Sequence, residues 1–443
     1  MAEIIRIKKG LDIPLSGKPS SEVKADNKTT LFAICPDDFP GPVWKAVVKP
    51  GDSVAAGDPL LKDKAYGKIL LVSPVSGTVT EVKRGERRHI DYISIIKQQD
   101  DSNAENRPKA SSPEQIRQAM LESGLWAMMR QRPYDIVPDP EVAPRDIFVT
   151  SFDSAPLAPE MLDAENTKWL EKGLRALAKL TTGKVFLGVK AGSSISSQAA
   201  TVYEFEGPHP AGNVGTQIAA IKPVNKGETV WTLDAVTAAK IGKLCEEGKL
   251  DFSVSVALTG PLVKNPHIVS TFAGAALSGL LDGQFKSDSD IRIISGNVLT
   301  GIKTSKDGFL HYPYRQITVI EEGNHADEFM GWASVSPMKY SVKRSFPAFL
   351  RGLSKPFDFD ARIKGGHRAM ILSGEYDKVF PFDIYPEYLL KAIIAGDIDR
   401  MEKLGIYEVA PEDFALPEFV DTSKIELQKI VREGLDNLRK ELS

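Results

Sequence analysis

Glycine and proline interrupt the first hundred residues at short intervals. Most of the segments between these residues have the length of strands, about 3–10 residues. Glycine and proline are also the residues that tight turns require. The interrupting positions are Pro14, Gly17, Pro36, Gly41, Gly51, Gly57, Gly67 and Gly77. Residues 1–97 are therefore predicted to form a small all-β module.

Two stretches of this module resemble a lipoyl or biotinyl domain. They are VVKPGDSVAAGDPLL, residues 47–61, and SPVSGTVTEV, residues 73–82, and they indicate a flattened β-barrel of the barrel-sandwich hybrid type. Asp63-Lys64-Ala65 resembles the lipoylation tripeptide, which raises the alternative of a carrier or adaptor with a swinging arm on Lys64. The segment that follows Lys64 is longer than in lipoyl domains, and no acyltransferase-like region accompanies it. A structural barrel is therefore the favoured interpretation.

The middle of the chain alternates strand-like and helix-like segments. The polar stretch 98–112 predicts a linker, and a connecting helix follows Pro113 within residues 98–142. Apolar runs at 146–151, 184–189 and 252–259 alternate with helical segments at Trp169–Leu180 and Asp234–Glu247. This alternation predicts an open, Rossmann-like α/β domain over residues 143–263.

The last part of the chain predicts two further units. A helix at Ser270–Leu281 and strands at Ile291–Ser295 and Gln316–Ile320 indicate a small α+β module over residues 264–330. Helical spacing over Pro386–Leu404 and Ser423–Leu442 indicates a largely helical part over residues 331–443.

Composition excludes several classes of function. The chain has 56 basic and 59 acidic residues and a net charge of -3, so it lacks the basic excess of a nucleic-acid binder. No segment approaches the roughly 20 apolar residues of a membrane span, and no signal peptide begins the chain, so a cytoplasmic location is expected.

The metal-ligating residues are sparse. Cys35 and Cys245 are the only cysteines, which excludes a disulfide framework, an iron-sulfur cluster and a four-cysteine zinc site within one chain. The six histidines show no paired spacing. We therefore predict no metal site, and no catalytic triad or acid/base pair is visible either.

The stretch GPHPAGNVGT, residues 207–216, forces a tight backbone. His209 stands between two prolines and could titrate near neutrality, but no Cys, Asp or His partner is visible, which favours a structural role. Gly212 and Gly215 match neither glycine-rich phosphate motif after a strand, so nucleotide binding is not predicted from them.

A ligand remains compatible with the open sheet. Such sheets bind ligands at the carboxyl ends of their strands, and Thr150, Ser151 and Asp153 follow the first predicted strand.

An ordered set of stretches resembles one family over residues 5–350. The stretches include IRIKKGLDIPLSG, LESGLWAMMRQRP, IFVTSFDSAPLA, EGPHPAGNVGTQI, ALTGPLVKNP, RIISGNVLTG and FMGWASVSPMKYSVKRSF. In this order they resemble the NqrA family, which belongs to the bacterial sodium-translocating NADH:quinone oxidoreductases.

The resemblance implies a peripheral subunit on the cytoplasmic side of the inner membrane, in a complex that oxidises NADH, reduces quinone and exports Na⁺. It implies a scaffold similar to the flavin subunit of complex I, with a β-grasp-like domain at 264–330. The flavin loop of the complex I protein and the clustered cysteines of the related Rnf protein are absent. NADH, flavins, the iron-sulfur centre and the Na⁺ path are therefore expected in partner subunits, and the isolated chain is expected to be inactive.

The family role carried over is participation in quinone reduction. A quinone head group needs an apolar slot with one or two hydrogen-bond donors. The aromatic, proline-rich segments 35–44 and 130–138 offer Phe39, Trp44 and Tyr134 as lining residues and Arg132 as a donor. Two alternatives stay open: these residues pack domains together, or the chain is a stand-alone flavin or nicotinamide oxidoreductase.

Overall fold

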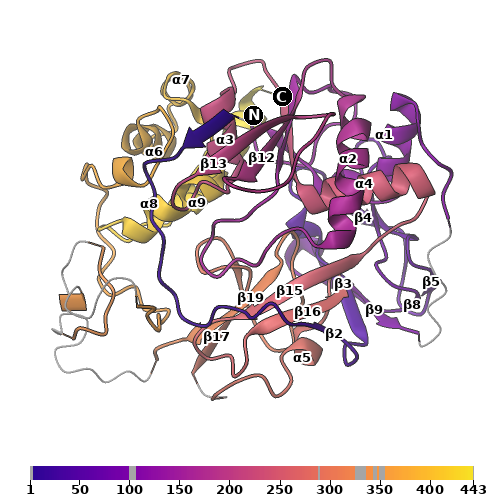
Figure 1. Cartoon of the computed structure of the whole chain (residues 1–443), viewed down its shortest axis with the longest axis horizontal. Helices are drawn as coiled ribbons and strands as arrows, with labels where there is room; N and C mark the ends of the chain where they lie inside the picture. The colour runs from indigo at the N-terminus through magenta and orange to yellow at the C-terminus, as the bar shows by residue number, and fades with distance from the viewer. Residues whose placement is uncertain are drawn as a thin grey trace.

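The computed structural model describes residues 3–98, 106–287, 290–324, 336–342, 347–348 and 355–442. Within these ranges the chain forms two six-stranded sheets, one four-stranded sheet and one three-stranded sheet. A group of helices near the C-terminus covers one side of the molecule, as Figure 1 shows in orange and yellow. The predicted fold class, a multidomain α/β and α+β protein with a helical C-terminal part, is confirmed.

The predicted β module is present as two small sheets that share one core. The first sheet has the order β3 (Leu31–Ile34), β9 (Ile90–Lys97), β8 (Gly77–Arg84) and β5 (Ser53–Val54), and the second has β4 (Trp44–Ala46), β6 (Pro59–Asp63) and β7 (Leu70–Val72). Leu60 and Leu61 of one sheet and Ile93 and Ile95 of the other are fully buried in the same cluster. Gly51, at φ +93°, occupies a turn that a residue with a side chain would adopt only with strain.

The first two strands pair outside this module. β1 (Glu3–Arg6) lies parallel to β13 (Thr201–Glu206), and β2 (Val23–Ala25) lies parallel to β16 (His267–Phe272). Figure 1 shows this indigo segment running from the upper sheet to the lower one. The N-terminal segment therefore adds an edge strand to each of the two large sheets.

The α/β sheet has the order β1-β13-β12-β11-β14-β10. β11 (Asp146–Thr150), β12 (Val185–Lys190), β13 and β14 (Val230–Asp234) are parallel, whereas β10 (Arg130–Arg132) is antiparallel to β14. The chain runs from β11 outward to β13 and then returns to the other side of β11 as β14. The order therefore reverses between β11 and β14, which makes this point the topological switch of a doubly wound sheet.

Helices cover the α/β sheet on both faces. α2 (Ala164–Ala178) and α4 (Ala235–Glu247) lie side by side (Figure 1), and a Cβ on Gly173 would stand 1.7 Å from the carbonyl oxygen of Ala238. Only glycine permits so close an approach of the two backbones. α3 (Val214–Ile221) packs through Ile218 against Phe148 and Phe186 in a separate cluster.

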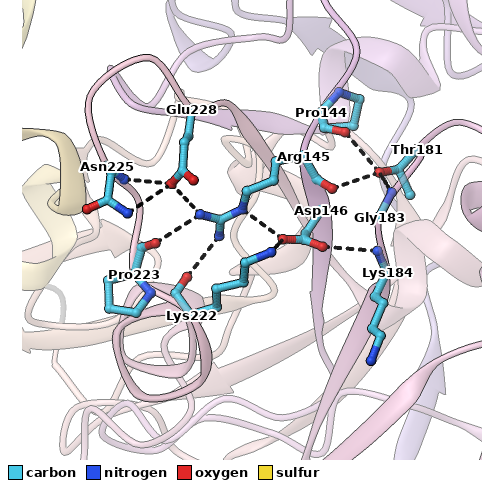
Figure 2. A network of polar contacts seen from close by, with 10 residues as sticks. All are labelled: Pro144, Arg145, Asp146, Thr181, Gly183, Lys184, Lys222, Pro223, Asn225 and Glu228. Carbon is cyan, nitrogen blue, oxygen red and sulfur yellow. Dashed lines mark hydrogen bonds and ion pairs between the residues drawn. The ribbon is translucent and has the colours of Figure 1, made fainter.

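The amino ends of the central strands are joined by a polar network (Figure 2). Asp146 accepts hydrogen bonds from Arg145 Nε and Lys222 Nζ, each at 2.7 Å, and from the Lys184 amide at 3.0 Å. Arg145 also pairs with Glu228, which precedes β14. This network connects β11, β12 and β14 at the edge opposite to their carboxyl ends.

The second large sheet is mixed and has the order β18-β17-β19-β15-β16-β2. It contains β15 (Ser253–Thr259), β17 (Ile291–Ser295), β18 (Ile302–Thr304) and β19 (Gln316–Glu321).

Two sequence-based expectations about this sheet are wrong. The sequence predicts the run at 252–259 as part of the α/β sheet, but β15 pairs with β16 and β19. The helix expected at Ser270–Leu281 is replaced by β16 and a four-residue helix α5 (Leu277–Leu280). Gly274 lies between β16 and α5 with a φ of +73°, which interrupts regular secondary structure there. In β16, pairing with the neighbouring strands outweighs the local helix propensity.

The C-terminal part packs around its own apolar cluster. It comprises α6 (Pro386–Ile394), α7 (Ile398–Lys403), α8 (Ala415–Val420) and α9 (Leu427–Leu442). α9 buries Leu427, Val431, Leu435 and Leu438, at the helical spacing that the sequence predicted. Of the predicted linker, residues 99–105 lie outside the described residues, and α1 (Pro113–Glu122) follows it with Ser112 and Gln115 forming a capping box.

Candidate functional site

A cleft lies at the switch point of the α/β sheet. Thr150 and Asp234 are paired residues at the carboxyl ends of β11 and β14, and both line a cavity of about 460 Å³. A second cavity of about 540 Å³ adjoins it. The two cavities share the residues Asp38, Met128, Phe152, Asp153, Pro159, Met161, Tyr312, Pro313, Tyr314 and Arg315. Both together are called the central cleft below.

Several parts of the chain meet at the central cleft. The 3-10 turn η1 (Pro36–Asp38) comes from the β module, residues 150–163 come from the α/β domain, and residues 310–316 come from the mixed sheet. Pro411 and Glu412 of the C-terminal part also line it. The cleft is therefore made by tertiary packing of segments that are far apart in the sequence.

The shared wall of the cleft is aromatic. The ring of Tyr312 stacks on Phe39 with a centroid distance of 5.2 Å and an interplanar angle of 12°. The guanidinium of Arg130 lies 5.4 Å from the Tyr312 ring centroid, within the range of a cation-π contact. Tyr312 also donates its hydroxyl hydrogen bond to the Met128 carbonyl. These contacts fix flat apolar surface at the junction of the two cavities.

Charged side chains also line the cleft, beside the aromatic residues. Arg315 forms an ion pair with Asp234 at 2.8 Å, and its Nη1 is buried without a hydrogen-bond partner among the described residues. Burial disfavours the ionised form of Asp234, but Arg315 and the Thr237 amide outweigh it and hold the pKa below its usual value. Lys240 donates to the Ser253 carbonyl at 2.6 Å, and burial lowers its pKa to about 8. The cleft therefore presents cationic donors beside its aromatic surface.

His209 belongs to the same cleft. Its Nδ1 lies 3.0 Å from the Ser154 hydroxyl, which accepts a hydrogen bond from the Gly212 amide at 2.8 Å. Because that hydroxyl is already an acceptor, we assign its proton to the bond with Nδ1, which leaves the imidazole proton on Nε2. Burial lowers the pKa of His209 to about 4. The expectation of titration near neutrality is therefore wrong, and His209 lines the cleft as a neutral group.

The two glycines after His209 are required by close contacts. A Cβ on Gly212 would stand 2.6 Å from the Ser154 amide nitrogen, and one on Gly215 would stand 2.2 Å from Asp413 Oδ1. Gly215 thus lets α3 approach the buried carboxylate of the C-terminal part, while Gly212 lines the cleft.

Arg132 lies at the cleft but is already engaged. Its side chain is 1% exposed and contacts Asp413 at 2.7 Å and Glu412 at 3.3 Å. Asp413 Oδ1 remains without a partner among the described residues. Burial and the adjacent Asp413 carboxylate raise the pKa of Glu412 to about 8. Glu412 lines the cleft through a side chain that is 42% exposed. Solvent therefore screens part of this effect, and its direction favours the protonated form of Glu412 relative to a free glutamate.

The four residues predicted to line a quinone pocket do not all lie at one site in the structure. Phe39 lines the larger cavity, and Arg132 lines the smaller one. Trp44 contacts Phe39 but faces a different surface groove. Tyr134 packs against the helical C-terminal part, and its carbonyl accepts a hydrogen bond from Arg432 at 2.6 Å.

The structure also places the residues that the sequence named at the strand ends. Thr150 and Asp153 line the cleft, whereas Ser151 is buried and donates to the Gly188 carbonyl. Tyr312, Arg315 and Lys240 were missed, because no local pattern shows that residues 310–316 and α4 reach this edge of the sheet.

The candidate carrier lysine has a structural setting of its own. Lys64 is exposed at the hairpin between β6 and β7. The preceding Asp63 is buried and accepts from the amides of Tyr66, Gly67 and Ile69 at 2.6, 3.1 and 2.7 Å. Asp63 therefore organises the hairpin, which gives this aspartate a structural role.

The fold and the cleft define a class: a multidomain α/β protein with a barrel-sandwich module and a ligand cleft at a sheet switch point. Among the described residues, none of the helices is long and apolar enough to cross a membrane.

Comparison with known proteins identifies the family. Residues 5–98 match the NqrA N-terminal barrel-sandwich hybrid domain, residues 111–250 the NqrA second alpha/beta domain, and residues 255–306 the NQRA C-terminal domain. The corresponding subunit of the Na(+)-translocating NADH-quinone reductase of Hahella chejuensis is 38% identical over 99% of this chain and 100% of its own length. Its counterparts in Pasteurella multocida and Neisseria meningitidis serogroup B are 38% and 36% identical with the same coverage. The chain belongs to the NqrA family of Na(+)-translocating NADH-quinone reductase subunits.

A solved structure, the NAD+-reducing NiFe hydrogenase in the air-oxidized state, is similar over 75% of this chain and 62% of its own. The identity is 12% and the TM-score 0.36, so this likeness adds nothing to the functional argument.

Proposed function

We propose that this chain is a peripheral subunit of a Na⁺-translocating NADH:quinone reductase and that quinone binds in its central cleft during reduction. The observation that carries the proposal is the composition of the cleft at the switch point. It combines the stacked pair Phe39 and Tyr312 with buried donors on Arg315 and His209. A flat head group with two carbonyl oxygens requires this combination of apolar surface and few donors.

Quinone reduction consumes two electrons and two protons for each quinol. In this proposal the electrons arrive from a reduced cofactor of a partner subunit, and this chain holds the head group. Glu412 faces the cleft, and its raised pKa favours the protonated form, so it is suited to protonate one reduced quinone oxygen. Its side chain is 42% exposed, so solvent can return a proton to Glu412 for delivery to the second oxygen. Neutral His209, with its proton on Nε2, is suited to donate a hydrogen bond to the second oxygen.

The proposal assigns NADH, the flavins, the iron-sulfur centre and the Na⁺ path to partner subunits, including those in the membrane. It places this chain on the cytoplasmic side of the inner membrane and expects no NADH oxidase activity from the isolated chain. The assignment of the iron-sulfur centre has chemical support: the only two cysteines are Cys35 and Cys245, too few for a cluster with four thiolate ligands.

Photo-crosslinking with an azido-quinone tests the proposal, on the isolated chain and in the assembled complex. We expect labelled peptides to include residues 35–39 or 310–316, with labelling competed away by free quinone. Labelling confined to partner subunits would leave this chain an adaptor. Labelling near Tyr134 instead would move the site away from the cleft.

A pair of tryptophan substitutions provides the matched control. Ala158 lines the larger cavity and is half-buried, whereas Ala65 is exposed at the hairpin tip outside the cleft. Ala158→Trp should fill the cleft and reduce competed labelling, while Ala65→Trp should leave it unchanged. Equal labelling in the two variants would contradict binding in the central cleft.

A further inference from the structure

Three metal-ligating side chains converge on the wall of the larger cavity. A sulfur of Cys35, a carboxylate oxygen of Asp38 and a ring nitrogen of His311 all lie within 4.8 Å of one another. All three residues line the cavity of about 540 Å³. Thiolate, imidazole and carboxylate are the three ligand types that proteins use for Zn²⁺.

The local backbone brings the first two ligands together. Cys35 is the N-cap residue of the 3-10 turn η1, and Asp38 is its last residue. Cys35 has extended backbone (φ -101°, ψ 110°) just before the turn, and the turn brings its sulfur and an Asp38 carboxylate oxygen within 4.8 Å. The sequence Cys-Pro-Asp-Asp therefore places the thiol and the second carboxylate beside one another at one turn.

His311 is brought to this turn from the mixed sheet. Its backbone amide donates to the Ser295 hydroxyl at 2.9 Å, which fixes the loop that carries it. The Tyr312 amide donates to Asp38 Oδ2 at 2.9 Å, and His311 Nδ1 lies 2.8 Å from Asp38 Oδ1. The bond at Oδ2 thus fixes the orientation of the Asp38 carboxylate, and Oδ1 faces the His311 ring.

The electrostatics of this wall favour a cation. Cys35 is a buried free cysteine, and its sulfur lies beside the Asp38 carboxylate. A bound divalent cation replaces the thiol proton and neutralises the adjacent Asp38 carboxylate.

The dimensions are compatible with a four-coordinate ion. Ligands at 2.0–2.3 Å from a tetrahedral Zn²⁺ are separated by about 3.3–3.8 Å. The three atoms are already within 4.8 Å, so the sulfur and the ring nitrogen need to shift by only about 1 Å relative to that bound to match this spacing. Entry of the ion requires the Asp38 and His311 atoms to separate from 2.8 Å and ends their mutual hydrogen bond.

We propose that Cys35, Asp38 and His311 form a binding site for a divalent transition metal of the Zn²⁺ class, with a fourth position open to the cleft. The thiolate ligand disfavours Mg²⁺ and Ca²⁺, which prefer oxygen. The proposal departs from the sequence-based prediction of no metal site, and it does not depend on quinone binding. An ion at this position joins the β module to the mixed sheet.

Cobalt provides the test, because a Co²⁺ ion bound to thiolate absorbs in the near ultraviolet and a tetrahedral one absorbs in the visible. The full-length chain, freed of metal by chelation, is titrated with Co²⁺ and then with Zn²⁺. We expect both sets of bands to saturate at one equivalent and to disappear when Zn²⁺ displaces Co²⁺. Absence of a thiolate band in the wild-type chain overturns the proposal.

Variants at both cysteines make the assignment specific. Cys35→Ser and His311→Gln should lose the bands, whereas Cys245→Ser should keep them, since Cys245 is the other buried thiol and lies on α4. Thermal unfolding without metal shows whether each variant is folded, and Asp38→Asn serves if Cys35→Ser is not. Persistence of the thiolate band in folded Cys35→Ser, or its loss in folded Cys245→Ser, refutes the site.

Discussion

Replacing Asp146 by Asn should destabilise the α/β domain by removing the acceptor at the centre of the network in Figure 2. The Asp146 side chain is 3% exposed, and its Oδ2 receives both Arg145 Nε and Lys222 Nζ. An Asn that keeps Oδ1 toward the Lys184 amide places an NH₂ group against these two donors. The substitution therefore exchanges two attractive contacts for two opposed donors.

The size of the effect follows from the exposure of each partner. The Arg145 side chain is 16% exposed, so its bond to a charged acceptor contributes about 1.5–3 kcal/mol. Lys222 is 49% exposed, so solvent screening reduces its share to about 0.2–1 kcal/mol. The total is about 2–4 kcal/mol, which corresponds to a fall in Tm of about 4–16 °C for a unit of 150–250 residues.

Differential scanning fluorimetry of the full-length chain measures this change, with Glu206→Gln as the control. Glu206 lies in β13 of the same sheet and pairs with Arg6 at 3.0 Å, but the side chains are 56% and 74% exposed. The control should therefore change Tm by no more than about 4 °C. Equal Tm values for the two variants would show that the buried network does not stabilise the sheet.

The pH dependence of the Tm difference between wild type and Asp146→Asn provides a second test, and its direction is predicted. Burial opposes ionisation of Asp146, but Lys222, the Lys184 amide and Arg145 together lower its pKa. Because the pKa of Asp146 is lower in the folded state, its ionised form stabilises the protein fully at pH values above the unfolded-state pKa of about 3.9. This stabilisation is lost as the pH falls through the folded-state pKa. The gap between wild type and Asp146→Asn should therefore narrow below about pH 4. A gap that stays constant to pH 3 would refute the ionic explanation.

Three further substitutions test other parts of the structure. Gly215→Ala should lower Tm clearly, because its Cβ would stand 2.2 Å from Asp413 Oδ1, whereas Gly366→Ala meets nothing within 4 Å; similar Tm values would contradict this packing. The wild-type protein should lose stability between about pH 4.3 and 8, because folded Glu412 retains a proton that the unfolded carboxylate releases. Glu412→Gln should reduce this loss. Scanning fluorimetry from pH 5 to 9 measures the slope of Tm against pH, and an unchanged slope argues against the raised pKa. Asp63→Ala should accelerate hydrogen exchange at Tyr66, Gly67 and Ile69, whose amides lose a buried acceptor. Unchanged protection at these amides would show that Asp63 does not order the hairpin.

Much of the fold could be predicted because its signals are local. Ser112 and Pro113 begin a helix through capping and a fixed φ angle, and the structure shows both in α1. The apolar runs at 146–151 and 184–189 are central parallel strands, which are buried on both faces. Strands β13 and β14 were not predicted, because their polar residues interrupt the apolar runs.

The candidate site was less predictable. Thr150 and Asp153 were named correctly as residues at the carboxyl edge, since that position follows from strand order alone. The predicted donor Arg132 finds its partners Glu412 and Asp413 some 280 positions along the chain, which no local pattern shows. Its capacity as a quinone donor is correspondingly reduced.

The sequence by itself determined the local elements, the glycine-dependent turns of the β module and the apolar faces of the terminal helices. These depend on backbone sterics and hydrophobic periodicity over a few residues. Only the tertiary structure decided that β15 joins the mixed sheet and that β1 and β2 extend two different sheets. It likewise brought His311 to within reach of Cys35 and Asp38. Pairing and packing depend on contacts between distant segments, so the cleft and its chemistry exist only after the chain has folded.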